Sequence, residues 1–162
     1  MQANIFVHLG RNNRIWNNVL ANATNKEGAG APLQIEGKLG YTFNNSFERN
    51  IVALHRTQTH MLVDGVSGFD EEYMNPHDVR RNIYYPVAHQ PDEPGSPPSW
   101  WELTDLTPLG NWDAWRAAGY DKDSVIGDPL FVDAANGNFC LQKDSAAREL
   151  GFEDIPDEVC MC

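Results

Sequence analysis

The chain of 162 residues has few cysteines, few basic residues and no long apolar run. Its three cysteines are an odd number, which argues against the disulfide framework of a small secreted domain. The absence of any apolar stretch of about eighteen residues excludes a membrane-spanning helix. Twelve basic residues stand against 23 acidic residues, and the net charge of −11 disfavours binding to nucleic acid or to anionic membranes.

Several catalytic and metal-binding patterns are missing as well. The sequence has no Gly-rich phosphate loop, no zinc-binding set of Cys and His, and no serine nucleophile elbow. Cys160 and Cys162 have no His nearby, so we expect a frayed tail with free thiols. Four aspartates lack the Gly and terminal Glu of an EF-hand loop, so no cofactor is predicted and calcium is a minor alternative: Asp121, Asp123, Asp128 and Asp133.

Charge and composition divide the chain near a Pro-rich stretch. Residues 1–90 contain eight basic and eight acidic residues, whereas residues 91–162 contain four and fifteen and carry the whole net charge. Four of the five tryptophans also lie in the second part. We therefore predict strand-forming coils over residues 1–90, a connection over residues 91–99 and a C-terminal cap over residues 100–162, within one structural domain.

A repeat in the first 90 residues is the most informative feature. Asn18, Asn50 and Asn82 each precede two apolar residues, and both intervals are 32 residues. A looser echo aligns residues 33–37 with residues 61–65, where alternating apolar and polar residues end at an acidic residue and Gly. A fixed period of this length indicates a stacked, repetitive architecture.

Between these positions the chain has the composition of short strands. Its apolar runs are short, rich in β-branched and aromatic residues, and separated by Asn and Gly, and residues 1–90 show no amphipathic helix of ordinary length. Several strands in each period predict a β-solenoid, in which each coil buries its inner face by stacking on the next. Asn suits the corners because it tolerates left-handed backbone and can hydrogen-bond from coil to coil.

The residues that carry this pattern resemble right-handed parallel β-helix proteins. Residues 5–10 and 13–19 resemble the rungs, and residues 112–133, continued to Phe152, are similar to the closing segment of β-helix domains in secreted bacterial glycoside hydrolases and polysaccharide lyases. The resemblance implies an all-β fold: a short right-handed parallel β-helix of about three coils with a C-terminal cap that contains short helices. It also implies action on, or binding of, an extracellular polysaccharide, in an extracellular or periplasmic location. Residues 1–4 show no signal-peptide pattern.

A non-catalytic role is the alternative to an enzyme. The tail motif is shared by proteins of different activity, so the chain is either a carbohydrate-active enzyme or a non-catalytic module. Such a module would be the C-terminal fragment of a larger β-helix protein, or a glycan-binding or structural unit. A solenoid of three coils also leaves strand edges at its N-terminal end, where we expect self-association or upstream coils.

The C-terminal part independently predicts the elements of a cap. We expect a short helix over residues 112–118 and a strand over residues 125–132 that is interrupted at Asp128–Pro129, because Pro lacks an N–H group. A hairpin turn is predicted at Asn136–Gly137, followed by a last helical turn that Asp144 caps. Such elements would cover the end of a solenoid, where apolar core and strand edges are otherwise exposed.

The densest polar cluster surrounds the third coil and the loop that follows it. Paired carboxylates suit glycoside cleavage, and a basic residue suits proton abstraction in β-elimination. The alternative is a solvated loop with ordinary surface charges. The catalytic candidates are Asp64 and Glu72, assisted by His60 and Arg56.

Tryptophans are candidate sugar platforms. Trp100 and Trp101 follow the Pro-rich stretch and cannot both face inward on a strand, so at least one is a candidate for a surface or ligand-binding role, and both are named as substrate-binding candidates. Trp112 and Trp115 are three residues apart on the predicted helix, so we expect both to pack in the core.

Two arginines are the remaining substrate-binding candidates. Arg49 and Arg81 share a phase of the repeat, so we expect them to lie one above the other. Stacked arginines can bind a uronate or a sulfate through paired hydrogen bonds. The alternative is ion pairing with Glu48 or Asp78 beside them.

Overall fold

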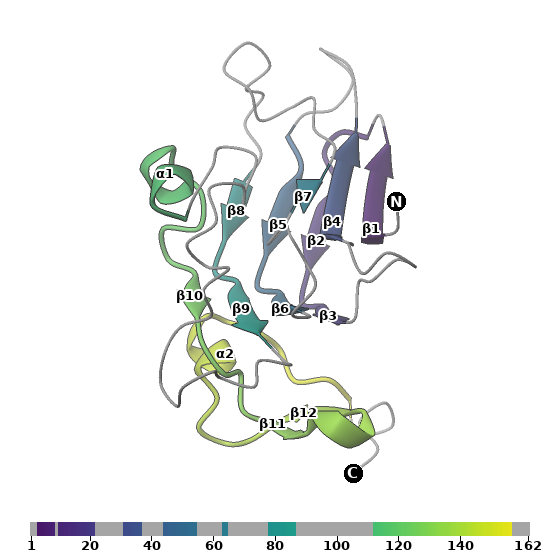
Figure 1. Cartoon of the computed structure of the whole chain (residues 1–162), viewed down its shortest axis with the longest axis vertical. Helices are drawn as coiled ribbons and strands as arrows, with labels where there is room; N and C mark the ends of the chain where they lie inside the picture. The colour runs from purple at the N-terminus through teal and green to yellow at the C-terminus, as the bar shows by residue number, and fades with distance from the viewer. Residues whose placement is uncertain are drawn as a thin grey trace, which may run out of the picture.

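The computed structural model describes residues 3–8, 10–21, 31–36, 44–54, 63–64, 78–86 and 112–156 (Figure 1). In this part of the chain strands predominate, helices are few and short, and no sheet closes on itself. The strands are β1 (Ala3–His8), β2 (Arg14–Trp16), β3 (Val19–Ala21), β4 (Ala31–Glu36), β5 (Ser46–Glu48), β6 (Ile51–Leu54), β7 (Val63–Asp64), β8 (Asp78–Arg80), β9 (Ile83–Pro86), β10 (Val125–Ile126), β11 (Phe131–Asp133) and β12 (Asn138–Leu141). The helices are α1 (Trp112–Ala117), the 3-10 helix η2 (Ala134–Asn136) and α2 (Ala146–Glu149).

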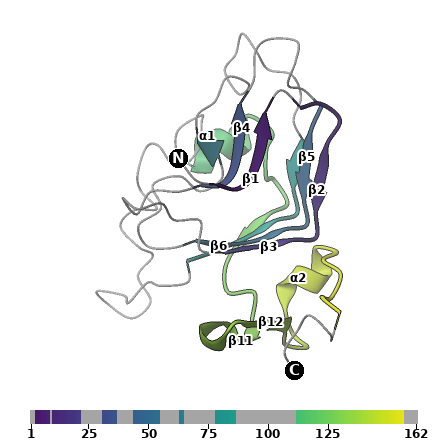
Figure 2. The ribbon, with the colours of Figure 1, turned by 90° about the vertical axis from the view of Figure 1, so that its right-hand side faces the viewer.

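Three parallel sheets are built from the repeats. We call β1–β3, β4–β6 and β7–β9 the first, second and third repeat. The first sheet has the order β1-β4-β7, the second β2-β5-β8 and the third β10-β9-β6-β3, so each sheet takes one strand from every repeat. Figure 2 shows the three sheets on three sides of a shared interior. The strand-rich, repetitive architecture expected for residues 1–90 is therefore confirmed at this level.

The 32-residue period is confirmed by the register of two sheets. In the third sheet Val19 pairs with Ile51, and Ile51 pairs with Ile83. In the second sheet Arg14 pairs with Ser46 in the same phase. Residues at equal phase therefore stack directly on one another, as the sequence predicted.

In the first sheet the alignment expected from the sequence is wrong by two residues. Val63 pairs with Leu33 rather than with Ile35. The connections that flank this sheet differ in length between repeats, so its strands are not held to the 32-residue period. Because side chains alternate along a strand, a shift of two residues keeps every position on the expected face.

Asparagine ladders join the repeats at the corner between the second and third sheets. The Asn50 Oδ1 atom accepts hydrogen bonds from the backbone N–H and the side-chain amide of Asn18, each at 3.0 Å. Asn82 Oδ1 accepts from Asn50 in the same way. Asn50 and Asn82 are 1% and 0% exposed, so these bonds also satisfy amides that water does not reach.

The left-handed corner residues are not the ladder asparagines. The residue before each ladder position has a positive φ: 58° at Asn17, 53° at Arg49 and 55° at Arg81. The expectation that the ladder asparagines occupy this conformation is therefore wrong, since two arginines adopt it instead. The ladder asparagines are fixed by their hydrogen bonds, and the corner conformation falls one residue earlier.

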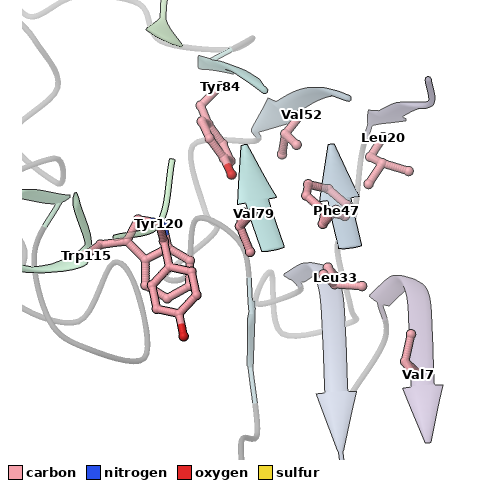
Figure 3. Close-up of a cluster of buried hydrophobic side chains, with 9 residues drawn as sticks. All are labelled: Val7, Leu20, Leu33, Phe47, Val52, Val79, Tyr84, Trp115 and Tyr120. Carbon is pink, nitrogen blue, oxygen red and sulfur yellow. The ribbon is translucent and has the colours of Figure 1, made fainter. Parts of the chain in front are cut away.

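The interior between the sheets forms the main core, which Figure 3 shows in detail. Its fully buried members include Leu33, Val52, Tyr84 and Trp115, each 0% exposed. Trp115 comes from α1, and Trp112 packs against the same cluster, with its ring edge-on to Tyr84 at 5.5 Å. The expectation that both tryptophans pack in the core is confirmed.

A second core lies on the outer face of the third sheet. Ile51 and Ile83 face away from the shared interior and pack against Phe131, Ala147 and Phe152 of the C-terminal segment. Figure 1 shows β11, β12 and α2 gathered beside β3, β6 and β9. The C-terminal segment therefore covers one face of a sheet as well as pairing β10 with β9.

The predicted C-terminal elements are confirmed in kind, with one correction. The strand expected over residues 125–132 is interrupted around Asp128–Pro129, as predicted, and forms β10 and β11. The final helix α2 is capped by Ser145 rather than by Asp144, because the Ser145 hydroxyl accepts the Ala147 N–H at 3.2 Å. The same hydroxyl donates to the Pro129 carbonyl at 2.6 Å and so ties α2 to the segment before β11.

Candidate functional site

The outer face of the first sheet brings together aromatic and polar positions. Phe6 pairs with Gln34, and Gln34 pairs with Asp64, so these three positions form one row across the sheet. His8 pairs with Glu36 in the next row on the same face. Paired positions of a parallel ladder share a face, and Leu33 in the alternate row is fully buried. We call these five positions the outer strip.

Phe6 and His8 define the described side chains of the outer strip. Phe6 is 53% exposed, the highest value among the exposed large apolar side chains of the described residues. Its ring stacks on the His8 imidazole with centroids 5.8 Å apart and planes 27° apart. The result is an exposed aromatic surface beside positions that carry an amide and two carboxyl groups.

This arrangement has the elements of a carbohydrate-binding surface. An aromatic ring packs on the apolar face of a pyranose, and carboxylates and amides hydrogen-bond to its hydroxyl groups. Glu36 and Asp64 are diagonal neighbours on adjacent strands of the first sheet, so two carboxyl-bearing positions lie on the same face.

The outer face of the second sheet is different because its charges are paired. The Glu48 carboxylate accepts from Arg14 at 2.7 Å and from Arg80 at 3.1 Å, and its side chain is 6% exposed. Burial opposes ionisation of Glu48, but the two arginines outweigh this effect and lower its pKa below the ordinary value. Arg80 also pairs with Asp78 at 3.2 Å.

Arg49 and Arg81 occupy equivalent corners, which confirms their expected stacking. Their partners differ from those expected, because both arginines contact the C-terminal segment rather than Glu48 or Asp78. Arg81 pairs with Asp123 at 3.3 Å, and the Arg49 guanidinium donates to the Gly151 carbonyl at 3.3 Å.

The Arg49 guanidinium is also held by an aromatic ring. It lies over the ring of Trp16, 4.5 Å from its centroid, and its side chain is 18% exposed. The Nε atom of Arg49 is buried without a hydrogen-bond partner. This arginine therefore anchors the chain's own C-terminal segment in the described structure.

Asp121 is the one fully buried carboxylate among the described residues. One oxygen accepts from Tyr84 and Trp115, each at 2.8 Å, and the other accepts from Asn82 at 3.1 Å and from Ser124. Burial raises the pKa of Asp121, while these four donors oppose the rise. Asp121 thus terminates the asparagine ladder and joins it to α1.

Metal-binding groups and membrane spans are not found in the described residues. No cluster of three or more His, Cys, Asp or Glu side chains occurs there, and Asp121 already accepts four protein donors. None of the described helices is long and apolar enough to span a bilayer. Cys140 is disulfide-bonded, which the odd number of cysteines did not lead us to expect.

The structure places only part of the candidate site. Asp64 lies in β7, at the end of the row that begins at Phe6. The other candidates lie outside the described residues: Arg56, His60, Glu72, Trp100 and Trp101. Sequence reasoning missed Phe6, His8 and Glu36, although the alternation of Phe6 and His8 with apolar residues in β1 was a usable signal.

Comparisons of the chain with protein-family models, with curated proteins and with solved structures give no match.

Proposed function

We propose that the chain is a right-handed parallel β-helix protein that acts on, or binds, an extracellular polysaccharide along the outer strip. The observation that carries the proposal is the exposed Phe6 ring stacked on His8, in register with Gln34 and Asp64. The β-helix assignment is supported by three parallel sheets in which successive repeats stack, with a 32-residue period in two of them. The disulfide at Cys140 is consistent with the extracellular or periplasmic location that the resemblance implies.

The chemistry of the outer strip fits a sugar polymer better than a protein or a nucleic acid. A row across parallel strands is flat and extended, so consecutive sugar rings can lie along it. The net charge of −11 opposes a polyanion, which favours a neutral polysaccharide over a uronate or sulfate polymer. In a catalytic version, Glu36 and Asp64 serve as the acid and base of glycoside cleavage.

Binding to a panel of neutral and acidic polysaccharides tests the proposal directly. Affinity electrophoresis should show retardation by at least one polymer, and Phe6→Ala should weaken it about tenfold or more, a typical loss for one aromatic platform. Val132→Ala is the matched control, because Val132 is 51% exposed on β11 and away from the strip. Absence of retardation by every polymer, or equal loss in both variants, would contradict the assignment.

A second assay separates an enzyme from a binding module. Release of reducing ends that is lost in Glu36→Gln and Asp64→Asn, with binding retained, would identify a hydrolase. Absorbance from unsaturated products would identify a lyase instead. Binding without either product signal would identify a non-catalytic module. Arg81 and Arg49, the expected anchors for an acidic sugar, bind the C-terminal segment, which favours a neutral polymer over a uronate or sulfate polymer.

A further inference from the structure

On the same side of the molecule, each of the three parallel sheets ends in a strand whose outer edge has no partner strand among the described residues. β1, β2 and β3 are the terminal strands of the first, second and third sheets. On the opposite side, β10 pairs with β9, Asp121 N–H bonds to the Val79 carbonyl at 2.7 Å, and Ser124 bonds to Asn82. No comparable cover lies on the first repeat among the residues that the structure describes.

The backbone N–H group at the start of each later strand of the third sheet donates to the preceding repeat. The Ile51 N–H donates to the Asn18 carbonyl at 2.8 Å, and the Ile83 N–H donates to the Asn50 carbonyl at 2.9 Å. The first residue of each of these strands therefore donates to the preceding repeat. In the first repeat the equivalent donor is the Val19 N–H, which has no acceptor among the described residues.

The second sheet repeats this pattern. The Ser46 N–H donates to the Asn13 carbonyl at 2.8 Å, and the Asp78 N–H donates to the Asn45 carbonyl at 2.9 Å. The equivalent donor of the first repeat is the Arg14 N–H, and the described part of the chain offers it no acceptor.

Donation to the Oδ1 atoms of the ladder asparagines runs the opposite way, from each repeat to the repeat after it. The Oδ1 atoms of Asn45 and Asn50 each accept two hydrogen bonds from the repeat before them, from Asn13 and Asn18 respectively. No described residue donates to the Oδ1 atoms of Asn13 and Asn18. The open end therefore presents two backbone donors and two amide acceptors in the geometry that joins the repeats already present.

We propose that this end binds a further repeat of the same kind, joined ahead of β1, with an Asn at each of two corners. That repeat supplies carbonyl acceptors for the Arg14 and Val19 N–H groups, and N–H donors for the Asn13 and Asn18 amide oxygens. Such a repeat would extend the established contact between repeats without any new type of bond.

A second copy of the chain does not reproduce the contact between repeats. Two open ends that face each other across a two-fold axis would pair their edge strands antiparallel, whereas the repeats already present pair in parallel. The other end of a second copy is blocked in the third sheet, where β10 already occupies the edge of β9. The parallel register therefore favours an additional repeat over self-association.

The first test uses the full chain as it stands. Light scattering after size exclusion should give a monomer, and hydrogen exchange should show fast exchange at the Arg14 and Val19 amides. Slow exchange at both amides together with a dimer mass would overturn the proposal, because a second copy would then be the occupant.

The second test adds a further repeat to the open end. A copy of residues 1–32 placed directly before Met1 sets its corner asparagines 32 residues ahead of Asn13 and Asn18. A copy of residues 31–64 gives the same spacing and serves as a second, independent extension. We expect exchange at the Arg14 and Val19 amides to slow about tenfold or more in at least one of the extended chains.

The matched control is the same extension with both of its corner asparagines changed to Ala. This control keeps the added length and apolar residues but removes the side-chain donors, so protection should fall back toward that of the unextended chain. Unchanged exchange at Arg14 and Val19 in both extensions would overturn the proposal. Equal protection by the Ala control would also overturn it, because the ladder would then not select the occupant.

Discussion

Asp121 offers the sharpest test of how the C-terminal segment is held on the repeats. Its carboxylate is 0% exposed and accepts bonds from Tyr84, Trp115, Asn82 and Ser124. Asp121→Ala leaves the Tyr84 hydroxyl and the Trp115 N–H buried without acceptors, at about 1–3 kcal/mol each. We expect a loss of about 3–5 kcal/mol in the free energy of unfolding, which includes strain at the left-handed φ of 46°.

Asp121→Asn separates geometry from charge. The amide keeps one oxygen for Tyr84 and Trp115 and can donate to the Ser124 hydroxyl, so its NH2 group conflicts only with the Asn82 amide. We therefore expect Asp121→Asn to cost about 1–2 kcal/mol, clearly less than Asp121→Ala. A larger cost in the Asn variant would show that the negative charge itself holds the site together.

The pH dependence of the stability difference between the natural chain and Asp121→Asn reports whether the pKa of Asp121 is raised or lowered by folding. Burial raises the pKa of Asp121 in the folded protein above its unfolded value, so the native state binds the proton more tightly. As pH falls from the raised folded pKa of Asp121 to its lower unfolded pKa, the natural chain gains stability relative to Asp121→Asn, which has no carboxyl group to titrate there. The difference between their free energies of unfolding should therefore widen as pH falls. A difference that shrinks instead would refute the reasoning, because it would place the folded pKa below the unfolded one.

Urea unfolding followed by tryptophan fluorescence measures both quantities, with free energies taken at each pH from the linear extrapolation. Asp123→Asn is the matched control, because its side chain is 50% exposed and pairs only with Arg81 among the described ion pairs. Exposed pairs of this kind contribute about 0–1 kcal/mol. A control loss as large as that of Asp121→Asn would remove the special role assigned to the buried carboxylate.

Three further variants test the ladder, the paired charges and the C-terminal turn, all by urea unfolding. Asn50→Ala should cost about 2–4 kcal/mol, because it strands buried amide groups, whereas exposed Asn4→Ala should cost under about 1 kcal/mol; equal costs would contradict the ladder. Glu48→Gln should cost about 1–3 kcal/mol at neutral pH, and because the folded pKa is lowered, this difference should disappear as pH falls through that pKa; a constant difference would contradict the assignment. Gly151→Ala should cost about 1–2 kcal/mol, since φ is +87° and a Cβ would lie 3.2 Å from an arginine carbon, whereas Gly127→Ala, with open space around it, should be nearly neutral.

The 32-residue repeat can be read from the sequence alone. Three asparagines recur at one phase because each occupies the same place in a stacked structure: Asn18, Asn50 and Asn82. Equivalent positions make the same hydrogen bonds and therefore require the same residue. The alternation of Phe6 and His8 with apolar neighbours likewise indicates which residues of β1 share its outer face. Such local patterns survive in the sequence because a strand or a corner imposes them residue by residue.

Only the tertiary structure decided how segments far apart in the chain meet. Arg81 lies 42 residues from Asp123, and Arg49 lies 102 residues from Gly151, so adjacent acidic residues appeared to be the natural partners. The outward-facing Ile51 is covered by a C-terminal segment that the sequence assigned to the solenoid end. A period fixes phase and face, but the docking of a non-repeating tail depends on surfaces that exist only after the repeats have stacked.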